Sequence, residues 1–94
     1  MGASNTSKAQ LRSQIEGEQN NIERTKRDIA NIKERIKNRK EYMKAHRHIW
    51  NKNDIAGFQN EFKYLQREID GLNSHIKNSQ DKIKRLREQM KNAK

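Results

Sequence analysis

The three histidines are the residues of this 94-residue chain whose chemistry would best suit catalysis or metal binding. His46 and His48 lie two residues apart, so a helix would turn them in different directions, whereas a zinc-binding pair on one helical face needs a spacing of three or four. His75 is distant in the sequence. The chain has no cysteine, which removes thiolate nucleophiles and sulfur ligands. The sequence therefore predicts a non-enzymatic protein with no metal, no cofactor and no small-molecule substrate.

Two groups of basic residues form a clearer functional signal. The first combines a column at a spacing of seven with two flanking residues, and comprises Lys26, Lys33, Lys37, Lys40, Lys44 and Arg47. On a helix this column would extend about 31 Å. The second group comprises Lys82, Lys84, Arg85, Arg87 and Lys91. The formal net charge is +10. These features predict a surface that attracts a polyanion. The candidates are nucleic acid, an acidic protein and an anionic membrane. The alternative is a solvated helix surface that binds nothing.

Three large aromatic residues near the middle of the chain form a second signal. Trp50 is the only tryptophan, and Phe58 and Phe62 follow it. Aromatic side chains are enriched among the residues that dominate protein–protein interfaces. Trp50, Phe58 and Phe62 therefore predict a partner-binding surface. The alternative is that they close the end of an apolar seam beside a helical turn.

The placement of Trp50 resembles that of the tryptophan in the WXG family, the small ESAT-like proteins of type VII secretion. Those proteins are of similar length, lack signal peptides and form helical hairpins with Trp-x-Gly at the turn. The motif here is Trp50-Asn51-Lys52, with Phe58 where family members often have a large residue. Lys52 thus occupies the position of the family's glycine, and the positive charge is unlike most members. The resemblance implies a hairpin that pairs with a helical protein, as a secretion partner or an accessory targeting factor.

The first residues of the chain match a lipidation signal. The segment from Met1 to Thr6 fits the Met-Gly-x-x-x-Ser/Thr pattern, which in a eukaryotic host directs myristoylation of Gly2. One myristoyl chain binds a membrane only marginally, but a basic surface can supply a second anchor. No apolar run is long enough for a signal peptide or a membrane span. We therefore expect a cytoplasmic protein or one exported by a signal-independent route.

The apolar residues that must position these side chains recur in two heptad patterns. Hydrophobic residues make up only 30% of the chain, which suits a single helical seam better than a compact core. The first pattern has a residues Ile15, Ile22, Ile29, Ile36, Met43 and Trp50, and d residues Leu11, Glu18, Thr25, Ile32, Arg39 and His46. The second has a residues Ile55, Phe62, Ile69, Ile76, Ile83 and Met90, and d residues Phe58, Leu65, Leu72, Ser79, Leu86 and Ala93.

The heptad phase changes across Asn51-Lys52-Asn53-Asp54, which is rich in turn-forming residues. The sequence therefore predicts an all-α protein, an antiparallel two-helix hairpin of the coiled-coil type. We expect a flexible tail over residues 1–7, helices over about 8–50 and 55–92, and a turn over about 51–54 with Asn53 or Asp54 as the helix cap. The register stays open, because Ile36 can face either Leu65 or Leu72.

A two-helix hairpin of this size has a thin core, so we expect it to form a homodimer or to dock on a helical protein. Glu18 and Arg39 lie at seam positions, where they either extend to solvent or fix the register or meet a partner helix. Three functional hypotheses follow. They are a protein–protein interaction module, a basic hairpin that binds nucleic acid, and an N-myristoylated adaptor on a membrane.

Overall fold

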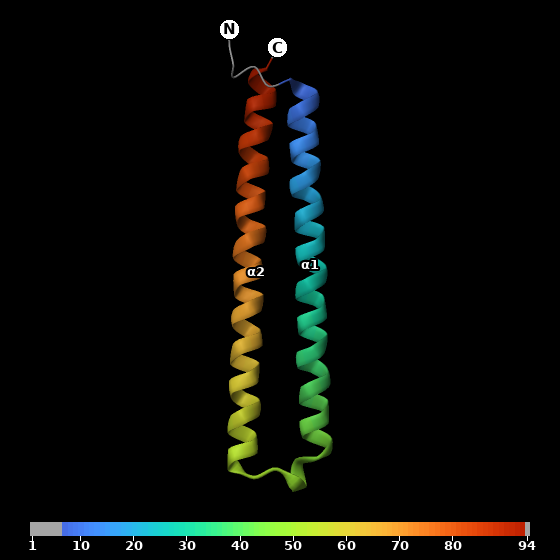
Figure 1. Cartoon of the computed structure of the whole chain (residues 1–94), viewed down its shortest axis with the longest axis vertical. Coiled ribbons are helices and arrows are strands. Elements are labelled where there is room, and N and C mark those ends of the chain that lie inside the picture. Colours follow the sequence, from blue (N-terminus) through green and yellow to red (C-terminus); the bar gives the residue numbers. More distant parts are fainter. Residues whose placement is uncertain (1–6, 94) are drawn as a thin grey trace.

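The computed structural model describes residues 7–93 and shows a helical hairpin (Figure 1). Helix α1 covers Lys8–Ala45, a short 3-10 helix η1 covers Arg47–Ile49, and helix α2 covers Lys52–Asn92. The two long helices run side by side in opposite directions, so the start of α1 and the end of α2 lie at the same end (Figure 1). The rod measures 71 × 16 × 15 Å. The prediction of an all-α antiparallel hairpin is confirmed.

Both long helices begin at reciprocal capping motifs. The Ser7 hydroxyl accepts a hydrogen bond from the Gln10 backbone N–H, and the Gln10 side chain accepts one from the Ser7 N–H, both at 3.2 Å. At the start of α2 the Asn51 side chain accepts from the Asp54 N–H at 2.8 Å, and the Asp54 carboxylate accepts from the Asn51 N–H at 3.1 Å. Each box satisfies two of the backbone donors that a helix start leaves unpaired.

The turn lies earlier in the chain than the sequence indicated. Helix α1 ends at Ala45 rather than near residue 50, and Asn51 caps α2 in place of Asn53 or Asp54. The physical reason is the Asn51–Asp54 box, which makes Lys52–Asp54 the first turn of α2 instead of a loop. The connection between the helices is therefore residues 46–51, and η1 occupies half of it.

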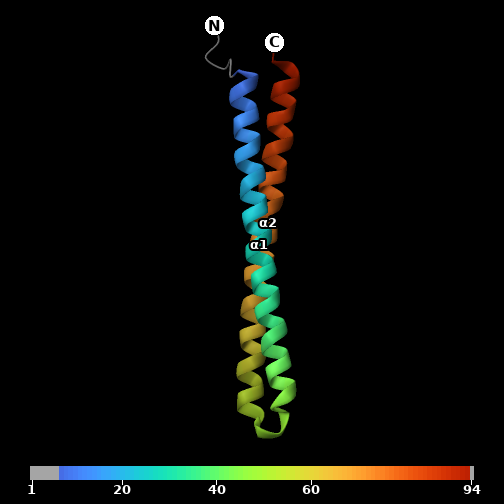
Figure 2. The same ribbon diagram turned by 90° about the vertical axis from the view of Figure 1, so that its right-hand side faces the viewer.

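The interface between the helices follows the predicted heptads. The residues of α1 buried there are Leu11, Ile15, Ile22, Thr25 and Ile29, and those of α2 are Leu65, Ile69, Ser79, Ile83 and Leu86. All are a or d positions, and the helices cross when the rod is viewed from the side (Figure 2), as expected of helices that coil around each other. Ile55 is the exception: this a residue is exposed, because it lies in the first turn of α2, where α1 has already ended.

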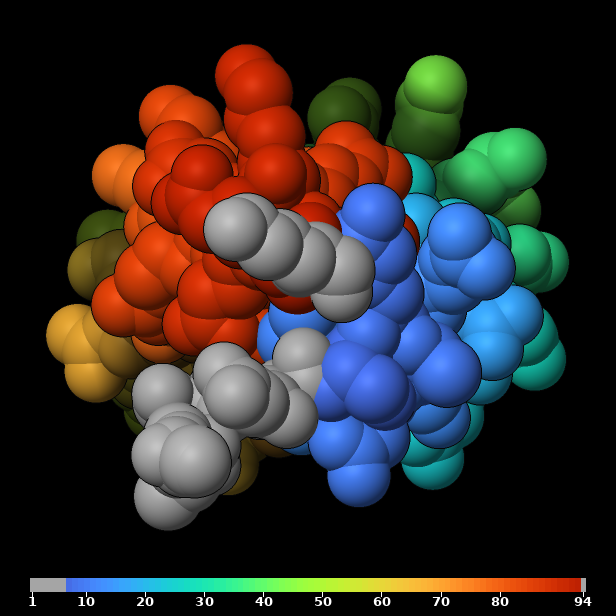
Figure 3. Space-filling model, turned by 90° about the horizontal axis from the view of Figure 1, so that it is seen from above, coloured from blue at the N-terminus to red at the C-terminus, as the bar shows by residue number. Residues whose placement is uncertain are grey.

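The packing is tightest at the end that carries the start of α1 and the end of α2. Leu11, Ile15, Ile22, Ile83 and Leu86 contact one another there as one buried cluster, and the two helix ends lie against each other when viewed along the rod (Figure 3). From Ile32 to the turn, the seam residues of α1 are only half-buried, as are Phe58 and Phe62 of α2. We call the end that holds this buried cluster the closed-packed end, and the end with residues 46–51 the turn end.

Two ion pairs across the hairpin set the register. Arg39 Nη2 lies 3.0 Å from Glu61 Oε2, and Lys82 Nζ lies 3.2 Å from Glu18 Oε2. These pairs place Ile36 level with Leu65 rather than with Leu72. Glu18 and Arg39 each form an ion pair across the hairpin in this register.

The ion pairs also distinguish the two edges of the seam. Both involve g residues of α2, Glu61 and Lys82, on what we call the mixed edge. On the opposite edge the e residues of the two helices face each other. Those with a positive charge are Arg12, Lys26, Lys33, Lys40, Arg47 and Arg87, and the others are Gln19, Gln59, Gln66, Asn73 and Gln80. We call it the basic edge, since no e residue is acidic.

Candidate functional site

Four aromatic rings gather at the turn end of the hairpin. The Tyr42 and His46 ring centroids lie 4.2 Å apart, and the Tyr42 and Trp50 centroids lie 5.8 Å apart. Trp50 meets Phe58 of α2 edge to face, with centroids at 5.0 Å and planes at 71°. These separations are typical of favourable aromatic pairs. The cluster joins the last turn of α1, the connection and the first turns of α2.

Trp50 also holds the connection in place through a hydrogen bond. Its indole N–H donates to the Met43 backbone carbonyl at 3.2 Å, which satisfies an otherwise unpaired acceptor near the end of α1. The His46 ring Nδ1 lies 3.0 Å from the Tyr42 carbonyl, which the His46 backbone N–H also contacts at 3.1 Å. Trp50 is half-buried in this arrangement. These contacts connect the end of α1, the connection and the start of α2.

The two phenylalanines lie on the seam with cations over their rings. The Arg39 guanidinium carbon is 4.9 Å from the Phe58 centroid, and Lys40 Nζ is 5.6 Å from the Phe62 centroid. Both distances permit cation–π attraction. Arg39 thus links Phe58 to Glu61, and its Nε is buried with no hydrogen-bond partner. Phe58 and Phe62 are half-buried, so each presents only part of its ring to a partner.

Three large hydrophobic side chains that the sequence did not predict as binding residues are exposed near the turn. Ile49 is 55% exposed, Tyr42 46% and Ile55 39%. Together with Trp50 and Phe58 they form what we call the turn-end surface. Tyr42 and Ile49 both fall on g positions outside the a/d seam, and this off-seam placement of large apolar residues was the available sequence signal.

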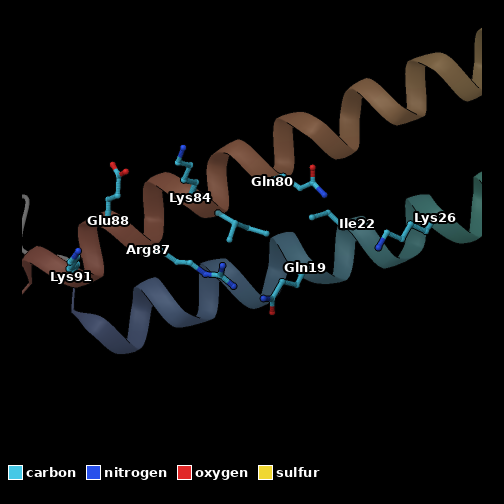
Figure 4. A pocket seen from close by; sticks show the side chains of 9 residues that line it. Gln19, Ile22, Lys26, Gln80, Lys84, Arg87, Glu88 and Lys91 are labelled. Carbon is cyan, nitrogen blue, oxygen red and sulfur yellow. The ribbon is translucent and has the colours of Figure 1, made fainter.

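The structure divides the predicted polyanion-binding residues among four places. Lys33, Lys37, Lys40 and Lys44 are exposed along the turn half of α1, and Arg47 is exposed beside them in η1. Lys26, Lys84, Arg87 and Lys91 line one groove of about 500 Å³ near the closed-packed end, with Gln19, Gln80, Glu88, Ile22 and Ile83 (Figure 4). Lys82 lies apart on the mixed edge, paired with Glu18, and Arg85 is exposed outside the groove.

A polar layer interrupts the seam beside this groove. The Glu18 side chain is only 16% exposed, and the hydrogen bond from Lys82 holds the pKa of its carboxyl below the ordinary value, with support from Ser79 and against the opposing effect of burial. Thr25, also buried, donates its hydroxyl to the Asn21 carbonyl at 2.8 Å. The buried polar groups of this layer thus find their hydrogen-bond partners within the hairpin.

Neither a metal-ligating cluster nor a membrane-spanning helix is found in the described part of the chain. Residues 7–93 contain no group of three or more metal-ligating side chains that could hold an ion, and none of their helices is long and apolar enough to cross a membrane. Gly2, the predicted lipidation site, lies outside the described residues.

Comparisons with known proteins add no relative. No protein-family model, curated protein or solved structure matches this chain. The resemblance to WXG proteins therefore stays a hypothesis.

Proposed function

We propose that this chain is a non-enzymatic interaction module that binds another helical protein through its turn-end surface. The observation that carries the proposal is the exposure of Tyr42, Ile49 and Ile55 beside the half-buried Trp50 and Phe58. Single exposed apolar residues are ordinary on protein surfaces. An exposed group of them around an aromatic cluster is typical of a contact site.

The anatomy of the turn-end surface supports this proposal. The rings of Trp50 and Phe58 are in contact at its centre, and the Arg39 guanidinium lies over the Phe58 ring and pairs with Glu61. Aromatic and arginine side chains are the residue types that contribute most to binding at protein interfaces. A partner that covers Ile49 and Ile55 would remove apolar surface from water without reorganising the turn. Type VII secretion machinery is one candidate source of such a partner, on the resemblance at Trp50 alone.

Site-specific photocrosslinking tests the proposal. A photoreactive amino acid replaces Ile49 in one variant and, as a control, the similarly exposed Tyr64 of α2 in another. We expect the photoreactive residue at position 49 to crosslink in the native host to one helical protein or to a second copy of the chain. Mass spectrometry identifies the product. The product should disappear on Ile55→Ser, while Trp50 and the turn remain intact. Equal products at Ile49 and Tyr64, or none at either, would refute the turn-end surface as a binding site.

The runner-up function is nucleic-acid binding along the basic edge. It is favoured by the exposed column of Lys33, Lys40 and Arg47, which lacks ion pairs to described residues. Phosphate contacts of this kind predict an affinity that falls steeply with salt. A fluorescent mixed-sequence duplex titrated at low and moderate salt tests it. Binding that weakens with salt and with Lys33→Glu and Lys40→Glu, but is unaffected by Ile49→Ser, would favour this function over the first.

A further inference from the structure

The groove at the closed-packed end is a second surface, separate from the one at the turn. It lies between the helices on the basic edge, where Arg87 extends from α2 toward α1 on the side of Gln19, while Lys84 and Glu88 stand on the outer side of α2 (Figure 4). Its lining includes two core isoleucines, Ile22 and Ile83. The groove therefore combines an apolar floor with charged walls.

The groove is elongated. A second hollow on the same edge, lined by Ala9, Arg12, Ile15 and Met90 among others, shares Arg87 with the first. Together they extend along α1 from Ala9 to Lys26, which is about 26 Å of helix. Their floor consists of a residues, the seam positions that a third helix would contact in a bundle. An elongated apolar floor suits a helix of about five turns better than it suits a compact small molecule.

The charge of the walls selects the kind of helix. Four side chains that line the first hollow are cations, namely Lys26, Lys84, Arg87 and Lys91, against one carboxylate, Glu88. The second hollow adds one further cation, Arg12, and one carboxylate, Glu16. Among these cations only Lys26 has an ion pair with a described residue, a long one of 3.9 Å to Glu23. A second copy of the hairpin presenting the same edge would bring like charges together. An occupant with Asp and Glu beside its apolar stripe would instead complement the walls.

We propose that this groove binds an acidic amphipathic helix of another protein. Its apolar stripe packs over Ile22 and Ile83, and its carboxylates pair with Lys84, Arg87 and Lys26. Nucleic acid and anionic lipid headgroups would pair with the cations but would not pack against the isoleucine side chains that line the groove, so the combination of apolar and basic lining favours the helix. The proposal does not depend on the turn-end surface, because the two surfaces lie toward opposite ends of the 71 Å rod.

A designed peptide tests the proposal directly. The probe is a fluorescent helical peptide of about 18 residues, matched to the length of the groove, with leucine at a and d positions and glutamate beside them. Its controls are a scrambled peptide of the same composition and a peptide with lysine in place of glutamate. We expect fluorescence anisotropy of the first peptide with the full chain to show saturable binding that weakens as salt increases. Neither control should bind comparably.

Two charge-reversed variants locate the binding. The groove variant carries Lys26→Glu, Lys84→Glu and Arg87→Glu, and the matched control carries Arg24→Glu, Arg35→Glu and Arg67→Glu, so both lose the same net charge. We expect the groove variant to bind at least about tenfold more weakly and the control to change less than about twofold. Circular dichroism must show equal helicity. If the groove variant is less helical, the double variant Lys84→Ala and Arg87→Ala, at which no core residue changes, replaces it.

Several outcomes would overturn the proposal. Equal binding of the designed and scrambled peptides would show that charge alone acts, without the apolar floor. Equal weakening by both triple variants would place the binding elsewhere. A mixed-sequence DNA duplex or phosphatidylserine vesicles can bind more tightly than the designed peptide at the same salt. If the groove variant abolishes that binding, the groove is assigned to a polyanion. Self-association that the groove variant abolishes would assign it to a second copy.

Discussion

Truncating Trp50 is the perturbation that best separates a structural role from a binding role for the turn. Trp50→Ala removes the hydrogen bond to the Met43 carbonyl and the edge-to-face contact with Phe58. Complete truncation of a core tryptophan costs about 3–5 kcal/mol. Since Trp50 is only half-buried, we assign about 2 kcal/mol to lost burial and pairing. The hydrogen bond adds about 1 kcal/mol.

The total of about 3 kcal/mol translates into a measurable shift. For a small protein with a denaturant slope of about 2 kcal/mol per molar urea, the midpoint should fall by about 1.5 M. Trp50→Phe keeps the contact with Phe58 but loses the hydrogen bond, so its midpoint should fall by about 0.5 M. The assay is urea unfolding followed by circular dichroism. Tyr64→Ala, at a more exposed aromatic residue, is the control and should change stability by less than about 0.5 kcal/mol.

A Trp50→Ala protein with the midpoint of the unaltered chain would refute this reasoning. It would mean that the ring contributes nothing to the isolated hairpin and is held for a partner. Loss of helicity throughout the chain would also contradict it, because the cluster at the closed-packed end does not contact Trp50.

Three further predictions concern the helices themselves. The pKa of the Glu18 carboxyl is lowered in the hairpin, so its ionised form stabilises the fold above the pKa that it has in the unfolded chain. This stabilisation is lost as the pH falls through the pKa of the folded state. Acid unfolding of Glu18→Gln should therefore lack this pH-dependent loss of stability. Asn51→Ala removes the cap of α2 and should destabilise the hairpin by about 1 kcal/mol in thermal unfolding, whereas Asn53→Ala should not. Gly71→Ala adds a Cβ that meets nothing within 4 Å and should stabilise α2 by about 1 kcal/mol in urea unfolding.

The sequence predicted the fold well because the physical signal was regular. Isoleucines at a spacing of seven, as in Ile15, Ile22 and Ile29, can be buried together only on one face of a coiled helix. The phase change after Trp50 then required a turn, and the hairpin confirmed it.

The details of the turn could not be read in the same way. The stretch from Asn51 to Asp54 contains three residues that can cap a helix, and only the reciprocal Asn51–Asp54 hydrogen bonds decide among them. The register required side-chain geometry as well. Arg39 and Glu61 form a pair only in one alignment of the helices, and heptad positions alone allowed two.

The candidate sites were predictable in part. Spacing identified Lys26 and Arg87 separately, but only the antiparallel pairing of e residues brings them into one groove. Spacing also gave Trp50 as a partner-binding residue, whereas its hydrogen bond and ring contacts turn much of it inward. Ile49 and Ile55 are exposed because the connection and the first turn of α2 have no helix opposite them, which a heptad pattern does not reveal.

The uneven packing along the rod has a mechanical consequence. A pulling force applied to the start of α1 and the end of α2 acts at one end of the hairpin (Figure 1). The contacts between the two helices must therefore separate one after another, from that end toward the turn. The buried cluster of Leu11, Ile15 and Leu86 is loaded first, and the half-buried levels near Trp50 are loaded last. In an optical trap we expect the highest force at the onset of extension and decreasing resistance afterwards, whereas a force that rises toward the turn would contradict this order. Such a rod resists extension up to a threshold force and then extends at lower force as the helices separate.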